Sequence, residues 1–411
     1  MPIQLSTDFM LPFRGRYYFA AIFGNGVFSY DFQQEDLRLE FRFPYPMPSF
    51  RLYKDILSWK DWLIFVPCNA PDIAIYHVDT GELELLPIPE RKPRRKTWCQ
   101  DGYHFWTGVL KGDRAYLVGQ GYPGILCLDL PSKNIEILDD WVNMVERRVH
   151  NKNNQPYGSE GIVRGDIAYF PLCCLDALLK LDFRTNETSV MPMHTGIRGF
   201  NGITDDGERL WITPRFFDDL LLYRPDTGAK KKIKLRHLYH GKPLGEVPYF
   251  RPIPFGENMI LPPIFASDFA AINRQTLMAV DWDRGEHGAR RVLLQPGTQD
   301  VVDCPMLLQN GALVYQEVAS GIWHILDKAE NQSFSMCMPA EDREVFARDF
   351  LKRNSVLNES EEFRLTEFLS LVDGLHEMKD SRKQLKSSGD GSLLRETNGQ
   401  KIWRCICNGG E

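Results

Sequence analysis

One unit of four short apolar runs, separated by turns, recurs along most of this chain. Its clearest copy covers residues 104–138. Each run is too short for a helix, and each is bounded by Gly, Pro or Asp, which favour turns. The unit therefore predicts a four-stranded antiparallel sheet in which consecutive strands are neighbours, and a chain that is all-β over most of its length.

The second run of the unit is strongly apolar and can be found seven times. The copies lie at 17–21, 62–66, 115–118, 167–170, 210–212, 259–261 and 313–315. Successive copies begin about 43 to 54 residues apart, which is the repeat range of propeller blades. A turn rich in Gly, Asp or Asn precedes six of them, and such residues tolerate the positive φ that hairpins require.

The third run of each unit ends in an acidic or amide residue. These residues are Asp31, Asp79, Asp129, Asp182, Asp226, Asn273 and Asp327. A carboxylate or amide oxygen at this point can accept a hydrogen bond from a backbone N–H two residues later and so fix the next turn. We therefore interpret these residues as structural and not as catalytic groups.

A four-stranded unit repeated seven times with these turn signatures resembles the β-propeller superfamily, which includes kelch, WD-repeat and NHL-type proteins. The resemblance covers residues 10 to about 338. The glycine pair of kelch blades is missing, and the Gly-His and Trp-Asp marks of WD repeats do not recur. The resemblance therefore implies the fold, a kelch-like ring of blades, but no family's functional residues.

The predicted fold is a seven-bladed propeller of four-stranded antiparallel blades, with six blades plus a cap as the alternative count. Two ways of closing the ring stay open. Side chains of the first and last blades could pack together, or a terminal segment (residues 1–5 or 401–406) could add an outer strand. A short helix is expected at 139–149, with Asp140 near its N-cap.

The propeller domain is predicted to span residues 1–338, followed by a helical C-terminal extension over 339–411. Two stretches of the extension, 339–352 and 359–372, have the apolar spacing of amphipathic helices. Residues 379–391 are rich in Ser, Lys, Asp and Gly and are predicted to be a flexible linker. Ile402 and Trp403 then form a small terminal anchor.

The composition bears on partners and compartment. A net charge of -6 gives no electrostatic reason to expect nucleic acid as a partner. Nine cysteines without regular spacing favour a reducing, cytoplasmic compartment. No apolar stretch is long enough for membrane insertion. The Cys405–Cys407 and His237–His240 pairs lack the spacing or partners of a metal site, so neither metal nor cofactor is expected.

Candidate site residues follow from the propeller geometry. The first strand of each blade lines the central channel, so the residues that open these strands meet at one mouth. In this register they are Asp55, Thr107, Glu160, Asn201, Arg251 and Asp303, with Asp8 or Phe9 in the first blade. Polar groups that converge above an apolar neck suit a small ligand. Trp106 and neighbouring aromatic residues could stack on a sugar ring, although rings more often pack between blades.

We therefore expect a binding or scaffold module that recognises a polar, carbohydrate-like ligand or a protein partner at the channel mouth. The alternative is a lyase or hydrolase acting on a carbohydrate or peptide at the same mouth. In that case Glu160 and Asp55 would act as acid and base, Arg251 would stabilise an oxyanion, and His104 would join the site. A third hypothesis is that the C-terminal helices dock a protein partner.

Overall fold

The computed structural model describes residues 5–45, 50–91, 104–149, 157–235, 247–266, 269–280, 302–317, 321–327, 331–339 and 342–343. Leu5–Met336 form one compact unit, and the described residues after Met336 belong to a separate unit. The predicted C-terminal helices, the linker and the terminal anchor fall almost entirely within 344–411 and lie outside the described residues.

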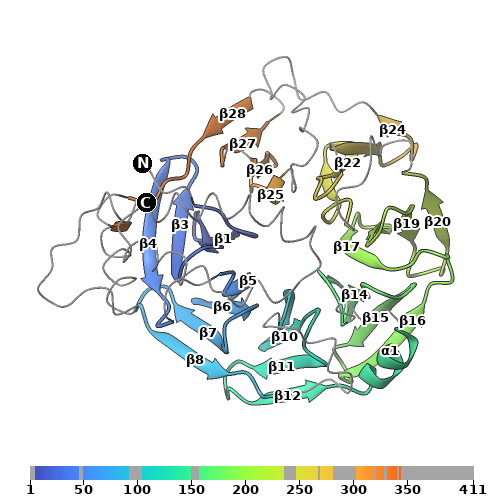
Figure 1. Ribbon diagram of the computed structural model, residues 1–411, viewed down its shortest axis with the longest axis horizontal. Coiled ribbons are helices and arrows are strands. Elements are labelled where there is room, and N and C mark those ends of the chain that lie inside the picture. Colours follow the sequence, from blue (N-terminus) through green and yellow to red (C-terminus); the bar gives the residue numbers. More distant parts are fainter. Residues whose placement is uncertain are drawn as a thin grey trace, which may run out of the picture. The chain divides into compact units, whose positions relative to one another are not determined.

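Within Leu5–Met336 the described residues form seven four-stranded antiparallel sheets. The sheets stand radially around one axis (Figure 1). The first sheet contains β1 (Leu11–Phe13), β2 (Arg16–Ala20), β3 (Gly26–Asp31) and β4 (Asp36–Arg42), and the second contains β5 (Tyr53–Trp59), β6 (Trp62–Pro67), β7 (Asp72–His77) and β8 (Leu83–Pro87). The third contains β9 (Thr107–Lys111), β10 (Arg114–Val118), β11 (Ile125–Asp129) and β12 (Ile135–Leu138), and the fourth contains β13 (Ile162–Arg164), β14 (Ile167–Pro171), β15 (Ala177–Asp182) and β16 (Glu187–Pro192).

The remaining three sheets repeat the pattern. The fifth sheet contains β17 (Phe200–Asp205), β18 (Leu210–Pro214), β19 (Leu220–Tyr223) and β20 (Lys230–Ile233), and the sixth contains β21 (Ile253–Phe255), β22 (Asn258–Leu261), β23 (Ala270–Asn273) and β24 (Ala279–Val280). The seventh contains β25 (Val302–Leu307), β26 (Leu313–Glu317), β27 (Trp323–Leu326) and β28 (Asn331–Phe334). In each sheet the strand order follows the chain order. The predicted seven-bladed β-propeller is therefore confirmed, and the count of six is wrong.

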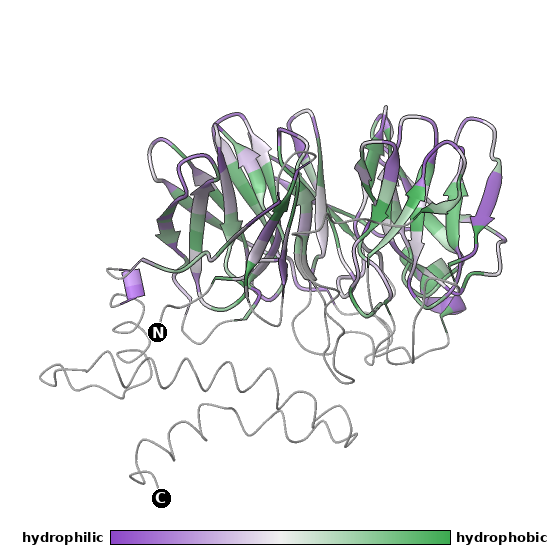
Figure 2. Cartoon of the chain, turned by 90° about the horizontal axis from the view of Figure 1, so that it is seen from above, coloured by the Kyte–Doolittle hydropathy of each residue, from purple (hydrophilic) through white to green (hydrophobic). Residues whose placement is uncertain are grey.

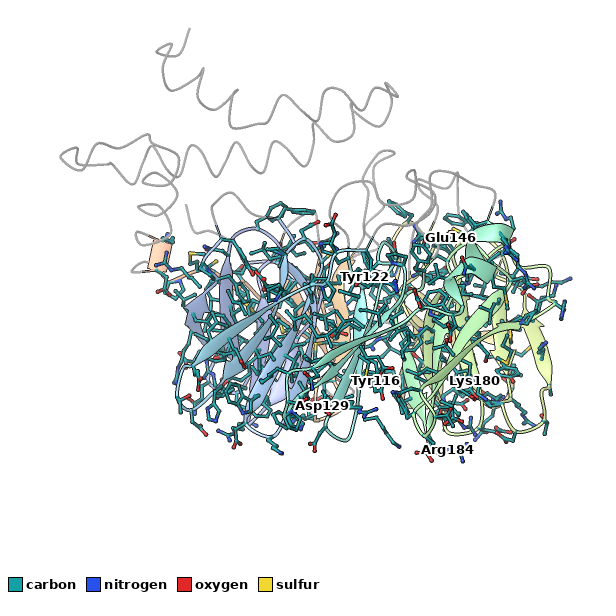
Figure 3. All side chains as sticks on the ribbon, turned by 90° about the horizontal axis from the view of Figure 1, so that it is seen from below. Tyr116, Tyr122, Asp129, Glu146, Lys180 and Arg184 are labelled. Carbon is teal, nitrogen blue, oxygen red and sulfur yellow. The ribbon has the colours of Figure 1, made fainter. Side chains whose placement is uncertain are left out.

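The ring has two faces, which Figure 3 distinguishes by its labels. Tyr122 and Glu146 lie toward one face, and Asp129 and Arg184 lie toward the other. Thr107, the first residue of β9, pairs with Val118 at the end of β10, and Tyr122 follows Val118 by four residues. The first strands therefore begin on the face of Tyr122. We call this the mouth face, and the opposite face, where each first strand turns into the second, the turn face.

Turn chemistry on the turn face follows the predicted pattern. Lys60, Gly112, Gly165 and Gly207 have φ of 53°, 60°, 63° and 90°. Asp31, Asp129 and Asp182 accept hydrogen bonds from backbone N–H groups two or three residues on. Asp79 and Asp226 differ, because their carboxylates pair with Arg14 and Arg164 from the preceding blade.

The core consists of apolar layers between neighbouring blades. Figure 2 shows hydrophobic residues concentrated along the strands and hydrophilic residues in the turns. Between the third and fourth blades, Tyr116 and Val118 share one buried cluster with Phe170 and Leu179. Bulky residues fill the space between radial sheets because each sheet must cover both of its faces.

The predicted helix at 139–149 is confirmed as α1 (Val142–Arg148). Its N-cap residue is Trp141, which makes no side-chain cap hydrogen bond, and Asp140 directly precedes it. Trp141 and Val145 join the buried cluster of the third and fourth blades. On the same helix the buried Glu146 accepts a 2.6 Å hydrogen bond from the hydroxyl of Tyr157. Among the described residues, no helix has the length and apolar character needed to cross a lipid bilayer.

The ring closes by contacts between complete first and last blades. The rings of Tyr30 and Phe334 stack with centroids 5.4 Å apart. The Leu5 N–H donates a 2.9 Å hydrogen bond to the carbonyl of Met336, and the Gln316 amide donates to the carbonyl of Leu5. Within the described residues the outer strand of the last blade is its own β28. The predicted side-chain packing between the first and last blades is therefore observed; residues 1–4 and 401–406, the terminal segments of the other predicted closure, lie outside the described residues.

Candidate functional site: the mouth of the central channel

A cavity of about 520 Å³ lies at the centre of the ring. All seven blades contribute to its lining, through segments at or just before their first strands: 8–12, 54–57, 106–108, 160–162, 203–205, 250–254 and 304–307. A cavity of this volume falls in the range of small-molecule sites.

Most of the predicted site residues line this cavity. They are Asp55, Trp106, Thr107, Glu160 and Arg251. The residues that follow along the strands are mainly apolar, such as Ile56, Leu57, Ile162, Ile203 and Ile253. Side chains from four blades that are far apart in the sequence therefore meet above an apolar channel wall.

Three predicted residues behave differently. The Asn201 side chain does not line the cavity; its amide donates a 3.2 Å hydrogen bond to the carbonyl of Tyr249 and links two blades. Asp303 lies in β25, but its side chain is outside the described part of the chain. His104 does not line the cavity either, and burial lowers the pKa of its imidazole.

The aromatic neighbours of the predicted residues divide into two groups. Tyr53, Phe105 and Phe200 are buried in the clusters between blades, and Tyr157 is buried beside α1. These rings have the packing role that sequence reasoning left open. Phe9, Trp106 and Phe250 line the cavity.

Irregular pairing explains why some side chains could not be assigned from alternation. The pairing of β5 with β6 shifts between Tyr53 and Asp55, so Lys54 and Asp55 both line the cavity. Similar shifts occur in β17 between Phe200 and Ile203 and in β25 between Asp303 and Met306. A bulge adds a residue to one strand and redirects its neighbours, which the period-two pattern does not reveal.

The cavity wall contains a buried charge cluster that sequence reasoning missed. The Asp8 carboxylate lies 2.7 Å from Lys54 Nζ and 2.6 Å from Arg51 Nε. Burial by itself raises the pKa of Asp8, but the two cations outweigh it and hold the pKa below its usual range. Lys54 Nζ also lies 4.5 Å from the centroid of the Trp106 ring. Asp8 is therefore ionised, and Lys54 is fully engaged.

Asp55 tethers the second blade to the third. One carboxylate oxygen accepts hydrogen bonds from the Thr107 hydroxyl (3.0 Å) and the Gly108 N–H (3.2 Å), and the other accepts from the Ile56 N–H. Burial raises the pKa of Asp55 to about 6, although these bonds and the charge of Arg251 act in the opposite direction. The carboxyl group therefore titrates close to neutral pH.

Glu160 and Arg251 face each other from the fourth and sixth blades. Arg251 Nε lies 3.7 Å from Glu160 Oε2, which is too long for a hydrogen bond. This Oε2 atom is buried and has no hydrogen-bond partner among the described residues. The Arg251 side chain is 51% exposed. The pair is thus loosely associated, and the Arg251 guanidinium is open to the cavity.

The backbone of Arg251 is more constrained than its side chain. A Cβ atom on Gly202 would lie 2.4 Å from Arg251 Cα and 2.7 Å from its N, so only glycine fits there. Pro252 follows directly and restricts the backbone of the residue before it. Gly202 and Pro252 therefore fix the position of the Arg251 backbone, while the Arg251 guanidinium stays accessible.

The residues that the structure describes contain no group of three His, Cys, Asp or Glu side chains placed to hold a metal ion. Independently of this, the described lining offers carboxylates, a guanidinium, hydroxyls and aromatic rings to a ligand.

Fold and channel together define the chain as a β-propeller with a central cavity that both polar and apolar residues line. No family model matches the chain, and no curated protein matches it. The solved structures do show similar proteins. A streptogramin B lyase is 15% identical with a TM-score of 0.54, covering 77% of this chain and 93% of the lyase.

Two further propellers are comparably similar. Virginiamycin B lyase from Staphylococcus aureus is 11% identical with a TM-score of 0.54, covering 77% of this chain and 95% of the lyase. BamB from Moraxella catarrhalis is 12% identical with a TM-score of 0.50, covering 82% of this chain and 90% of BamB. At such low identity these similarities establish the shared fold alone, because one fold supports many functions.

Proposed function

We propose that this protein is a binding module that takes a small polar, carbohydrate-like ligand at the mouth of its central channel. The observation that carries the proposal is the convergence of Asp55, Thr107, Glu160 and Arg251 on one cavity of about 520 Å³. The four residues come from four blades, so their meeting is a product of the fold and not of local sequence.

The chemistry of the cavity suits a polyhydroxylated molecule. Carboxylate oxygens of Asp55 and Glu160 can accept hydrogen bonds from ligand hydroxyls, and Arg251 can donate to ligand oxygens. Phe9 and Phe250 also line the cavity and offer apolar ring surface to a sugar face. A rigid ring holds these groups in place before the ligand binds, which reduces the entropy cost of binding.

The test is a calorimetric and thermal-shift screen of neutral sugars, sugar acids, nucleotides and amino acids. We expect a sugar-like compound to bind, and the double variant R251Q/E160Q to lose that binding without a change in fold. The matched control is R198Q/D218N, which removes an exposed ion pair of 3.2 Å away from the cavity. Equal binding by both double variants would place the ligand elsewhere.

A lyase or hydrolase acting at the same mouth is a second candidate, and one observation favours it. A carboxyl group with a pKa of about 6 that shares its cavity with a second carboxylate and an arginine can exchange protons near neutral pH. Asp55, Glu160 and Arg251 would carry the chemistry; His104 lies outside the cavity. Turnover of a bound sugar or peptide that D55N abolishes while binding persists would select this function.

A protein partner is the remaining alternative, held either by the mouth face or by the C-terminal extension. Deletion of residues 339–411 separates these cases, because a partner docked on the extension is lost and a partner docked on the mouth face is retained.

We also propose a reducing, cytoplasmic compartment. The support is that Cys68, Cys127 and Cys173 are buried and form no disulfide in the part of the chain that the structure describes. Location of a tagged full-length chain by cell fractionation tests this.

A further inference from the structure

Among the described residues that line the cavity, one cation is available to a ligand. Arg251 is half exposed, and its only ion-pair partner in the described part of the chain is Glu160 at 3.7 Å. The other cation of the cavity wall, Lys54, is 8% exposed and bound to Asp8, which also binds Arg51. A ligand oxyanion that enters the channel therefore meets the Arg251 guanidinium.

The guanidinium geometry selects the kind of anion. Its planar set of N–H donors matches the two oxygens of a carboxylate in a bidentate arrangement. Gly202 and Pro252 fix the Arg251 backbone, so the side chain that carries the N–H donors extends from a defined position. The nearby carboxyl groups of Asp55 and Glu160 oppose a strongly charged group such as a phosphate dianion more than a singly charged carboxylate.

The same two carboxyl groups indicate what the rest of the ligand presents. As acceptors, Asp55 and Glu160 are best matched by hydroxyl donors. Thr107 adds a hydroxyl at the same level of the channel, although it already donates to Asp55. A ligand with several hydroxyls and one carboxylate uses all of these groups at once.

We propose that the ligand is an acidic sugar of the hexuronate class, whose carboxylate is bound by Arg251 and whose hydroxyls donate to Glu160 and Asp55. This inference rests on the proposed function and specifies its ligand. In the ligand-free protein Glu160 acts as a loose counter-ion for Arg251, and the ligand carboxylate takes its place.

The experiment compares four probes on the full-length protein by isothermal titration calorimetry. They are sodium D-glucuronate, D-glucose, sodium acetate and inorganic phosphate, chosen to separate the carboxylate from the hydroxyls. We expect glucuronate to bind at least tenfold more tightly than each of the others. Galacturonate and galactose repeat the comparison with the other common ring configuration.

Variants then assign the carboxylate contact. R251Q should weaken glucuronate binding ten- to a hundredfold and abolish the preference over glucose, because a charge-assisted bidentate contact is lost. R251K keeps the positive charge but lacks the planar guanidinium. Its affinity for glucuronate should therefore lie between those of R251Q and the wild type. E160Q should bind glucuronate more tightly, because a competing negative charge is removed. R198Q removes an exposed arginine outside the cavity and should behave as the wild type.

The outcomes distinguish this inference from the proposed function. Equal affinity for glucose and glucuronate would leave the sugar-binding function standing and overturn the acidic-sugar inference. Binding of acetate or phosphate as tight as that of glucuronate would show that the site does not require the hydroxyls of a sugar, and would overturn the acidic-sugar inference. Glucuronate binding that R251Q leaves unchanged would overturn the role of Arg251. Absence of binding by every sugar and sugar acid at millimolar concentration would overturn both.

Discussion

Asp8 shows how a single buried carboxylate organises part of the channel wall. It is 6% exposed and pairs with Lys54, which lies in β5 of the second blade, and with Arg51, which lies just before β5. Buried charges are stabilised only when paired, so removal of one partner is costlier than removal of both. The cluster therefore couples the first and second blades at the mouth face.

Substitution of Asp8 tests this coupling. D8A should destabilise the protein by about 3–5 kcal/mol, because two cations lose their common partner in a poorly hydrated site. D8A/K54M should recover part of this loss, since one of the cations is removed as well. Urea unfolding at pH 7 measures both; a double variant less stable than D8A would contradict the interpretation.

Asp55 makes stability depend on pH. Its pKa is about 6 in the folded protein and near the ordinary 3.8 in the unfolded chain. Between these values the folded state holds a proton that the unfolded state has released, so stability is fully present below about pH 4 and falls as pH rises through 6. The loss amounts to about 3 kcal/mol, from about 1.4 kcal/mol per pKa unit.

The D55N variant isolates this effect. It lacks the titrating group, so the stability of the wild type relative to D55N should decline by about 3 kcal/mol between pH 4 and pH 7. D55N itself loses one acceptor for Thr107 and Gly108, which shifts its stability equally at every pH. Urea titrations at several pH values measure the difference, and a difference that is constant with pH would refute the raised pKa.

At this scale the sequence predicted part of the cavity. Asp55, Thr107, Glu160 and Arg251 could be found because each opens a first strand in the repeat register. Lys54 and Asp8 could not be paired in advance, since their contact depends on the bulge in β5. The Asn201 side chain faces the neighbouring blade for a related reason, because β17 changes register at that point.

Among the elements, first strands carry cations that reach the next blade on the turn face. The pairs are Arg14–Asp61, Lys60–Asp113, Lys111–Asp166 and Arg164–Asp205. In each pair the cation ends the first strand of one blade or begins the turn after it. The carboxylate lies in the corresponding turn of the next blade or, for Asp205, at the end of the strand before that turn. Exposed pairs contribute about 0–1 kcal/mol each, so they align neighbouring blades more than they stabilise them.

The turn residues of these pairs were predictable, but their pairing was not. The Gly-Asp turns were visible as hairpin signals, yet nothing local in the sequence shows that Asp166 meets Lys111 across 55 residues. The basic run in β20 was predictable as an exposed outer strand. The structure adds that Lys230 and Lys232 donate to the carbonyls of Met193 and Thr195 near the end of the fourth blade.

Gly202 in β17 is the element-scale feature that most directly supports the site. G202A places a Cβ against backbone atoms of Arg251, so it should destabilise the protein by about 2–3 kcal/mol or more and displace Arg251. G165A is the control: its φ of 63° is strained for alanine, but no atom lies within 4 Å. It should cost about 1 kcal/mol and leave ligand affinity unchanged. Thermal unfolding and calorimetry measure both; equal losses would argue against the clash.

For the whole ring, closure was predictable only as a choice between two arrangements. The repeat count predicted seven blades, because each unit carries its own four runs, but it left six blades plus a cap as the alternative. The stacking of Tyr30 on Phe334 depends on bringing together residues about 300 positions apart, which no local pattern reports. The Leu5–Met336 hydrogen bond is equally non-local.

Truncation of Phe334 tests the closing contact. F334A should destabilise the protein by about 2–3 kcal/mol, because a partly buried ring and its stacking partner are lost. The matched control is F183A, whose ring packs on Tyr116 between the third and fourth blades. Hydrogen exchange should rise in β1–β4 and β25–β28 for F334A and in the third and fourth blades for F183A. If F334A instead raised hydrogen exchange equally in all blades, the contact of Phe334 with Tyr30 would not act on the first and last blades alone, contrary to this prediction.

Because each described sheet takes all four strands from one continuous stretch, no sheet is shared between distant parts of the gene. A duplication or deletion of one repeat's codons would add or remove one entire sheet, and a circular permutation at a blade boundary would leave every sheet whole. The number of repeats is thus open to change in evolution by single events, and the site at the centre changes with it, since every blade supplies part of its wall.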